Sequence, residues 1–281
     1  MMHELQHTVE QLFALPPHEL QYDGRTAHTC ATILDALNSS AIRAATRNDD
    51  GAWVVHAWVK QGILLLFRAG RLEDMSTDEN FRFFDKDTLR TRAFTLDDKV
   101  RIVPGGTTIR NGAYLAHGVI CMPPAYVNIG AHVGEGTMID SHALVGTCAQ
   151  IGARVHISAA AQIGGVLEPA GARPVIIEDD VMVGGNCGVY EGVVIRSRAV
   201  LGSGVVLNAS TPVYDLVHET IHRSTPDRPL EIPEGAVVIA GSRAVASPFG
   251  AQHGLSMSTP LIVKYRDEKT DARTALEAAL R

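Results

Sequence analysis

The sequence predicts a mainly β protein: a left-handed parallel β-helix of six-residue repeats, preceded by a helical N-terminal domain and capped by a short strand and helix. The first observation is an apolar residue at every sixth position, in two long registers. They are Val103, Ile109, Leu115, Cys121, Val127, Val133, Ile139, Val145, Ile151, Ile157 and Ile163, then Ile177, Val183, Val189, Ile195, Leu201, Leu207 and Val213. The second observation is that glycine often follows the apolar residue. A period of six is neither that of a helix nor that of an alternating strand.

This period fits a coil with three flat sides, each made of one short strand and one turn, with the aliphatic residue pointing inward. Three hexads close a coil, so each residue stacks on the one three hexads later, as in other solenoids. A sandwich rich in valine and glycine could reproduce the period only by chance, and two long registers argue against it. The expected stacked pairs include Asp140 with Ser158, Gly134 with Gly152, and Gly146 with Gly164.

The remaining elements follow in order along the chain. In an N-terminal domain of residues 1–100, helices are predicted over 3–14, 24–37 and 57–67, and a turn at 48–51 predicts a hairpin over 42–55. The charged residues 78–100 are expected to form a lid or linker. The catalytic β-helix is expected over residues 101–215 and a C-terminal extension over 216–281. The extension should hold a strand at 261–265 and a helix at 271–280 that covers the last strand edges.

The bulk composition narrows the choice of partners. The 281-residue chain has a net charge of −6 and a pI near 6.0, so it offers no basic face for nucleic acid. Its longest apolar run, residues 62–67, is too short to span a membrane, and its N-terminus shows no export signal. The four cysteines, which form no CxxC pair, are expected to be reduced thiols. We therefore expect a cytoplasmic protein with no bound metal.

Several segments carry more information than the repeat alone. Within the coil these are residues 126–140, 145–152, 162–169 and 174–179; outside it they are residues 41–43, 53–60, 84–86 and 100–104. Together they resemble the tetrahydrodipicolinate N-succinyltransferase family of lysine and diaminopimelate biosynthesis, over roughly residues 30–245. The Gly-Gly-Val-Leu-Glu-Pro motif at 164–169 and the Met-Ile-Asp motif at 138–140 are much more specific than a hexapeptide signature.

The resemblance implies a homotrimer in which an amine attacks the thioester of succinyl-CoA, in grooves between subunits. This chemistry needs an uncharged amine, hydrogen-bond donors for the thioester oxygen, and cations for the carboxylates of the acceptor. Asp140 follows the inward Ile139 and should face outward; the resemblance makes it the substrate-binding and catalytic carboxylate. Arg101 matches the family's substrate-binding arginine. The alternatives are that Asp140 caps a turn and that Arg101 is a solvated surface residue.

One departure from the family pattern concerns the acceptor. Many family members read Ser-Glu-Val-Val-Glu-Gly, with the first Glu beside the acceptor amine, whereas residues 187–192 here read Cys-Gly-Val-Tyr-Glu-Gly. Gly188 thus replaces that Glu, and Asn186 replaces the usual Arg two positions before it. Gly188 stays a candidate substrate-binding position. The alternative function is an acetyl- or succinyltransferase paralogue that acts on a related amino acid in secondary-metabolite, tabtoxin-like biosynthesis.

Coenzyme A is the expected carrier, as succinyl-CoA or acetyl-CoA, and no permanently bound cofactor is expected. The small outward residues Gly185 and Ser203 would let the pantetheine arm lie along the coils. Arg196, Arg198 or Lys264 could meet its phosphates, although each could equally be a solvated surface residue.

Three other classes of protein fit less well. A γ-type carbonic anhydrase needs zinc-binding histidines at a spacing that His117, His132, His142 and His156 do not offer. A sugar-nucleotide acetyltransferase is disfavoured because the first 100 residues hold no Gly-rich nucleotide loop. A non-catalytic scaffold would bind no coenzyme A. Within an acyltransferase, His142 or His156 is an alternative base.

Overall fold

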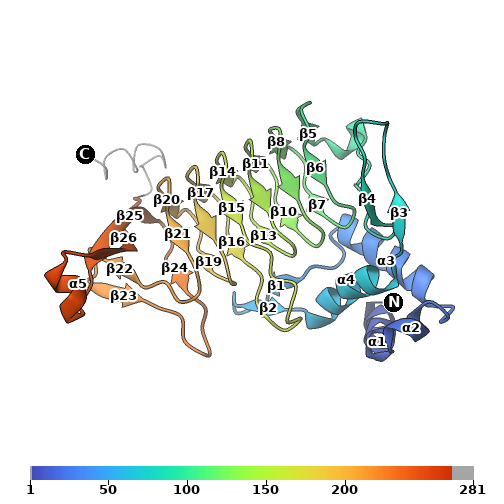
Figure 1. The fold of residues 1–281 in the computed structure, drawn as a ribbon, viewed down its shortest axis with the longest axis horizontal. Coiled ribbons are helices and arrows are strands. Elements are labelled where there is room, and N and C mark those ends of the chain that lie inside the picture. Colours follow the sequence, from blue (N-terminus) through green and yellow to red (C-terminus); the bar gives the residue numbers. More distant parts are fainter. Residues whose placement is uncertain (1, 268–281) are drawn as a thin grey trace.

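The computed structural model describes residues 2–267. Figure 1 shows a long coil with helices gathered at its start and a β ribbon at its end. The coil is the left-handed parallel β-helix that the sequence predicts.

Helices cluster at the start of the coil. They are α1 (Met2–Ala14), α2 (Pro17–Leu20), α3 (Thr26–Asn38) and α4 (Ala57–Ala69). Helices α1 and α3 pack on α4 and bury an aliphatic cluster that also includes Ile129 and Cys148 of the coil. The three predicted helices are confirmed. The short α2 was not predicted; it begins at Pro17, whose fixed φ suits the first turn of a helix.

Two hairpins precede the coil in the chain, one before α4 and one after it. The predicted hairpin is confirmed: β1 (Ala45–Arg47) pairs antiparallel with β2 (Trp53–Val55), and Gly51 takes the positive φ of 77° that its turn requires. A second hairpin joins β3 (Leu72–Asp74) to β4 (Phe84–Lys86), and the one-turn helix η1 (Leu96–Asp98) follows. Strand β4 and helix η1 lie within residues 78–100. That this segment acts as a lid or linker stays a prediction.

The coil consists of two-residue strands on three faces, which the chain visits in turn. Face A contains β5 (Arg101–Ile102), β8 (Ile120–Cys121), β11 (Met138–Ile139), β14 (His156–Ile157), β17 (Met182–Val183) and β20 (Val200–Leu201). Face B contains β6 (Thr108–Ile109), β9 (Tyr126–Val127), β12 (Leu144–Val145), β15 (Gln162–Ile163), β18 (Gly188–Val189) and β21 (Val206–Leu207). Face C contains β7 (Tyr114–Leu115), β10 (His132–Val133), β13 (Gln150–Ile151), β16 (Ile176–Ile177), β19 (Val194–Ile195) and β24 (Glu231–Ile232).

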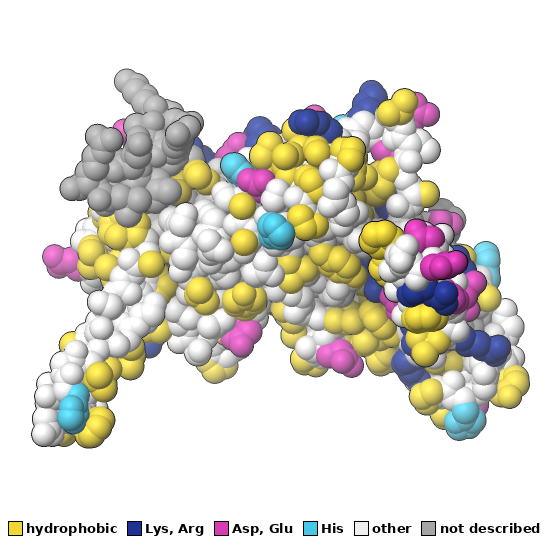
Figure 2. Space-filling view, turned by 45° about the horizontal axis from the view of Figure 1, so that its top comes forward, with side chains coloured by type: hydrophobic (Ala, Val, Ile, Leu, Met, Phe, Trp, Pro, Cys, Tyr) yellow, Lys and Arg dark blue, Asp and Glu magenta, His cyan; other side chains and the backbone are white. Residues whose placement is uncertain are grey.

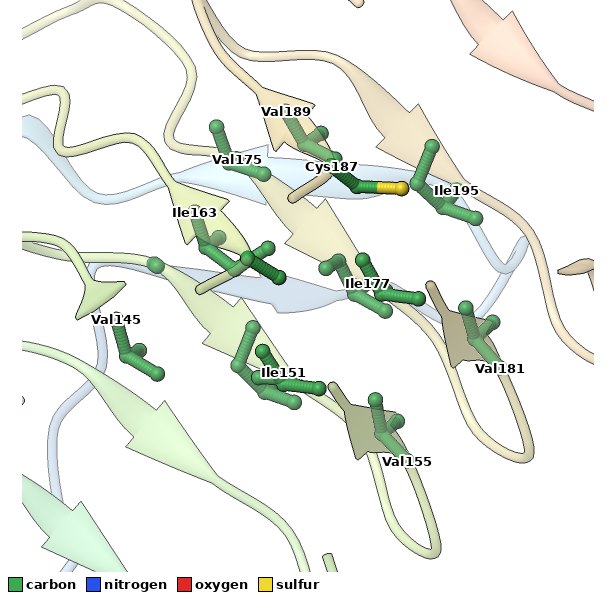
Figure 3. Close-up of a cluster of buried hydrophobic side chains, with 14 of the residues drawn as sticks. Val145, Ile151, Val155, Ile163, Val175, Ile177, Val181, Cys187, Val189 and Ile195 are labelled. Carbon is green, nitrogen blue, oxygen red and sulfur yellow. The ribbon is translucent and has the colours of Figure 1, made fainter. Parts of the chain in front are cut away.

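The predicted phase of the repeat is confirmed. In face A, Ile139 lies beside Ile157, so the residues that follow them stack in the next turn. The second residue of each strand points inward, and Figure 3 shows these aliphatic side chains in successive layers of the core. Burying each such side chain contributes about 1.5–3 kcal/mol, which offsets the cost of ordering the backbone. The glycine pairs stack as expected, Gly134 on Gly152 and Gly146 on Gly164.

The register differs from the prediction at both ends. At the start, Ile102 and not Val103 pairs with Cys121, because the turn at Gly105 and Gly106 takes one additional residue. At the end, Val213 does not continue face C. It begins a strand outside the coil, and β24 completes face C after a long excursion of the chain.

The break between the two registers is a long turn, residues 164–175, that leads from face B to face C. The fully buried Lys60 of α4 holds this turn, because its Nζ donates a hydrogen bond to the carbonyl of Ala172 at 2.6 Å. Burial lowers the pKa of Lys60.

Beyond the coil, face A continues into a ribbon. It contains β22 (Val213–Asp215), β23 (Thr220–His222), β25 (Ala236–Ala244), α5 (Pro248–Gln252) and β26 (Ser256–Tyr265). Strand β25 pairs parallel with β20, and β26 pairs antiparallel with β25. The strand predicted at 261–265 is confirmed as the second half of β26, whereas the helix predicted at 271–280 lies outside the described residues.

Candidate active site

The turns that lead from face A to face B form edge A/B, and Asp140 stands on it. Because Asp140 follows the buried Ile139, its side chain faces outward, as predicted, and is 31% exposed. Its Oδ1 accepts a hydrogen bond from the backbone N–H of Ser141 at 2.7 Å, so Asp140 does stabilise its turn. Its Oδ2 accepts no hydrogen bond within residues 2–267 and can receive a ligand.

His156 faces this free carboxylate oxygen. It lies in β14, beside Met138 of the preceding coil, and its Nε2 is 3.9 Å from Oδ2 of Asp140. That nitrogen is buried and has no hydrogen-bond partner in the described part of the chain. A small displacement would bring the two atoms into hydrogen-bond contact. The structure thus places one of the two alternative bases, His156, next to Asp140.

Small side chains continue along edge A/B over the next coils. A Cβ on Gly185 would lie 3.3 Å from the carbonyl oxygen of Ala159 and 4.0 Å from Oγ of Ser203, so these three residues are stacked. Successive strands are about 4.8 Å apart, which makes the stack about 10 Å long. Two residues predicted to bind coenzyme A, Gly185 and Ser203, therefore share one edge with Asp140.

Arg101 lies on face A, at the start of the coil. It pairs with Ile120, which pairs with Met138, so Arg101 is two strands, about 10 Å, from the strand that precedes Asp140. Its side chain is exposed and points outward.

The other predicted basic residues do not join this edge. Arg196 lies on the edge between faces C and A, where Nη1 donates to Glu178 at 2.9 Å and Nη2 to Glu231 at 2.7 Å. Arg198 follows on the same edge, and its Nη2 donates to the carbonyl of Asp267 at 2.9 Å. Lys264 lies in β26, opposite Val237, beyond the last coil.

Gly188 points outward from face B, on β18. Its strand neighbour Gln162 donates hydrogen bonds, at 3.2 Å each, to the carbonyls of His142 and Ala160 on edge A/B. Asn186 precedes it on that edge with a left-handed φ of 56°. The predicted acceptor position therefore borders the same edge as Asp140.

Glu178 is a polar centre that the sequence did not reveal. Its side chain is 5% exposed, and it accepts hydrogen bonds from Arg47, from Trp53 Nε1 at 2.9 Å, from Arg196, and from the backbone N–H and hydroxyl of Ser197 at 3.1 Å each. Burial by itself would raise the pKa of Glu178, but the donors outweigh burial and lower the pKa to about 2. No periodicity marks this residue, because its partners come from distant segments.

Within residues 2–267, no group of three or more His, Cys, Asp or Glu side chains is placed to hold a metal ion. None of the helices in that range is long and apolar enough to cross a membrane.

Two family models match the chain. Residues 4–69 match "Tetrahydrodipicolinate N-succinyltransferase N-terminal", and residues 174–209 match "Hexapeptide repeat of succinyl-transferase". The first match covers α1 to α4, and the second covers the coils that follow the long turn.

Curated relatives align over nearly the whole chain. The 2,3,4,5-tetrahydropyridine-2,6-dicarboxylate N-succinyltransferase of Paramagnetospirillum magneticum is 40% identical over 269 residues, which is 93% of this chain and 92% of that protein. The enzyme of the same name from Polynucleobacter asymbioticus is 40% identical over 95% of this chain and 93% of its own. The enzyme of the same name from Nitrobacter hamburgensis is 39% identical over 92% of this chain and 95% of its own. Since identity of this level extends over both chains, the protein belongs to the tetrahydrodipicolinate N-succinyltransferase family of acyltransferases.

Proposed function

We propose that the protein transfers a succinyl group from succinyl-CoA to the amine of ring-opened tetrahydrodipicolinate, 2-amino-6-oxopimelate. The main support is the arrangement on edge A/B, where the carboxylate of Asp140 stands at the end of a stack of small residues. A pantetheine arm can lie along such a stack because no side chain projects from Gly185. Membership of the family supports both the thioester donor and the dicarboxylate acceptor.

In the reaction, the amine nitrogen bonds to the thioester carbonyl carbon, the carbon–sulfur bond breaks, and coenzyme A leaves as its thiol. The acceptor arrives as an ammonium ion and must lose a proton before it can attack. Asp140 would hold the ammonium group and take that proton, and the nitrogen loses a second proton as the amide forms. One of the two protons reaches the departing thiolate and the other passes to solvent. Arg101 would pair with a carboxylate of the acceptor.

We further infer a homotrimer with the active sites between subunits. In one chain, Arg101 is exposed and Asp140 is only half-buried, whereas small-molecule sites normally enclose most of their ligand. The outward side chains of face A include the half-buried Ile120, Met138 and Met182. Figure 2, in which the top of Figure 1 is turned forward, shows hydrophobic side chains gathered on the coil. A second subunit on this surface would cover these side chains and close the groove.

A second candidate is the paralogue with a different acceptor, and the observation that favours it is the pair Asn186 and Gly188 in place of Arg and Glu. A thiol-release assay that crosses succinyl-CoA and acetyl-CoA with a panel of amino-dicarboxylates separates the two. We expect release with succinyl-CoA and tetrahydrodipicolinate together. Release only with acetyl-CoA, or only with another amino acid, would identify the paralogue. No thermal shift with either donor or with CoA would identify a scaffold.

The phosphates of coenzyme A need cations near the far end of the small-residue stack. Arg198 and Lys264 stay candidates, while Arg196 is already bound by two carboxylates. Substituting either candidate by Met should raise the KM for the donor several-fold with kcat unchanged, if it meets a phosphate.

A further inference from the structure

The ring of Tyr190 lies over Gly188. A Cβ built on Gly188 would be 2.5 Å from Cε2 of Tyr190, and 3.0 Å from both Cζ and the hydroxyl oxygen. The ring also crosses Gly164 of the preceding coil, where a Cβ would lie 2.7 Å from Cδ1. Ordinary carbon contacts are about 3.5–4.0 Å. The phenol ring therefore fills the volume that a side chain at position 188 would need.

Positions 188 and 190 both differ from the Ser-Glu-Val-Val-Glu-Gly pattern that residues 187–192 resemble. That pattern has Glu at 188 and Val at 190, whereas this chain has Gly188 and Tyr190. Both positions project outward from the same strand and its turn, so their side chains compete for one space. Glu at 188 would collide with Tyr190, and Val at 190 would leave an empty space beside Gly188. The two changes compensate each other in volume.

Having Gly188 and Tyr190 instead of Glu and Val also changes which polar group is present beside position 188. A carboxylate attracts an ammonium group and repels a carboxylate, whereas a phenol hydroxyl is neutral and can donate a hydrogen bond to an oxygen. Asn186, two residues earlier, is neutral as well. Through Gln162, this part of face B is tied to edge A/B, on which Asp140 and Gly185 lie. The Tyr190 ring therefore lies on the face that adjoins edge A/B, over the strand neighbour of Gln162.

We propose that Tyr190 is a specificity-determining residue of the acceptor site, and this inference rests on the proposed acyl transfer. Its ring closes the space beside Gly188, and its hydroxyl offers a hydrogen-bond donor where the family pattern has a carboxylate. The site then selects an amino acid that presents a carboxylate or carbonyl oxygen at this point. Changing Asn186 and Gly188 alone to Arg and Glu cannot restore the family arrangement, because the Tyr190 ring still occupies the space.

The test is a double-mutant cycle of Gly188→Glu, Tyr190→Val and both together, with Tyr190→Phe as a separate variant. The melting temperature of each protein and its kcat/KM for each acceptor, with succinyl-CoA as donor, are measured. We expect Gly188→Glu to lower the Tm, and the double variant to regain much of that loss. We expect Tyr190→Phe to keep the Tm and the KM for succinyl-CoA, and to lower kcat/KM for the preferred acceptor about 10-fold, as for one lost hydrogen bond.

Two control substitutions make the same residue changes, Gly to Glu and Tyr to Val, at positions outside the coil. Gly24→Glu adds the carboxylate where no atom lies within 4 Å of the new Cβ, and Tyr22→Val removes a tyrosine that is 83% exposed. If the Tm loss of the double variant equals the sum of the losses of Gly188→Glu and Tyr190→Val, the two side chains do not compete for one space. Unchanged acceptor preference in both Tyr190→Phe and Tyr190→Val would overturn the role in specificity. Absence of thiol release by the parent with every acceptor would overturn the proposed function, while the Tm cycle would still decide the packing.

Discussion

Removing the charge of Glu178 is expected to detach the β1–β2 hairpin from the coil. The hairpin contributes Arg47 and Trp53 to this carboxylate, and the coil contributes Arg196 and Ser197. The substitution Glu178→Gln keeps the size of the side chain but removes the buried anion that Arg47 and Arg196 share, and Arg196 then keeps only Glu231. Breaking a buried pair in this way typically costs about 3–5 kcal/mol.

The pKa of Glu178 gives an independent estimate of the same quantity. Its decrease from 4.5 to about 2 corresponds to about 3 kcal/mol of folding free energy. Because the pKa in the folded state is the lower one, this stability is fully present above about pH 4.5. It is lost as the pH falls through the folded-state pKa of about 2, below which the carboxylate is protonated in both states. Glu178→Gln should therefore reduce the free energy of unfolding by about 3 kcal/mol at pH 7 and by little near pH 2.

Urea unfolding followed by tryptophan fluorescence measures this, since the two tryptophans, Trp53 and Trp58, lie in the hairpin and at the start of α4. The control is Asp50→Asn, which removes an exposed carboxylate from the turn of the same hairpin and should change stability by less than about 0.5 kcal/mol. A loss below about 1 kcal/mol at pH 7, or an equal loss at pH 7 and near pH 2, would refute the reasoning.

The other predictions concern catalysis, packing and assembly. Asp140→Asn should lower turnover about 10²-fold or more and leave the assembly intact; wild-type turnover would reduce Asp140 to a turn-stabilising residue. Gly134→Ala should cost about 1–3 kcal/mol in urea unfolding, because its Cβ would lie 2.5 Å from the backbone of Gly152, whereas Gly171→Ala, in open space, should be neutral. Light scattering should give about 90 kDa, three copies of the 30.1 kDa chain, and a mass of one chain would contradict an active site between subunits.

The fold could be predicted because each coil repeats the same local requirement, an inward aliphatic residue. One error, at Val103, comes from a turn that is one residue longer, and the other lies where a long-range contact replaces the repeat. Val213 has the right spacing for face C, but its strand pairs with β23 and β26 instead. The six-residue period cannot predict this pairing, because the partner strands β23 and β26 lie later in the chain and outside the repeat.

The candidate site could be predicted only in part, for a similar reason. The position of Asp140 follows from its place directly after Ile139, so the repeat alone turns it outward. The surroundings of Arg196 depend on Glu178 and Glu231, which come from other coils and from beyond the repeat. The overlap of Tyr190 with Gly188 depends on the direction of one ring, which spacing does not specify.

The covered ends of the coil explain why its length is fixed. At the start, Asn38 of α3 donates to Asn111 at 2.6 Å and accepts from the backbone N–H of Gly112 at 2.8 Å, so a helix meets the first coil. At the far end of face A, β26 pairs antiparallel with β25. It therefore runs in the opposite direction to the coil strands of that face. Within residues 2–267, a second molecule therefore cannot extend face A as a further parallel strand at its far end. A closed end of face A favours association of copies through the sides of the coil, which is the geometry of a closed assembly rather than an open polymer.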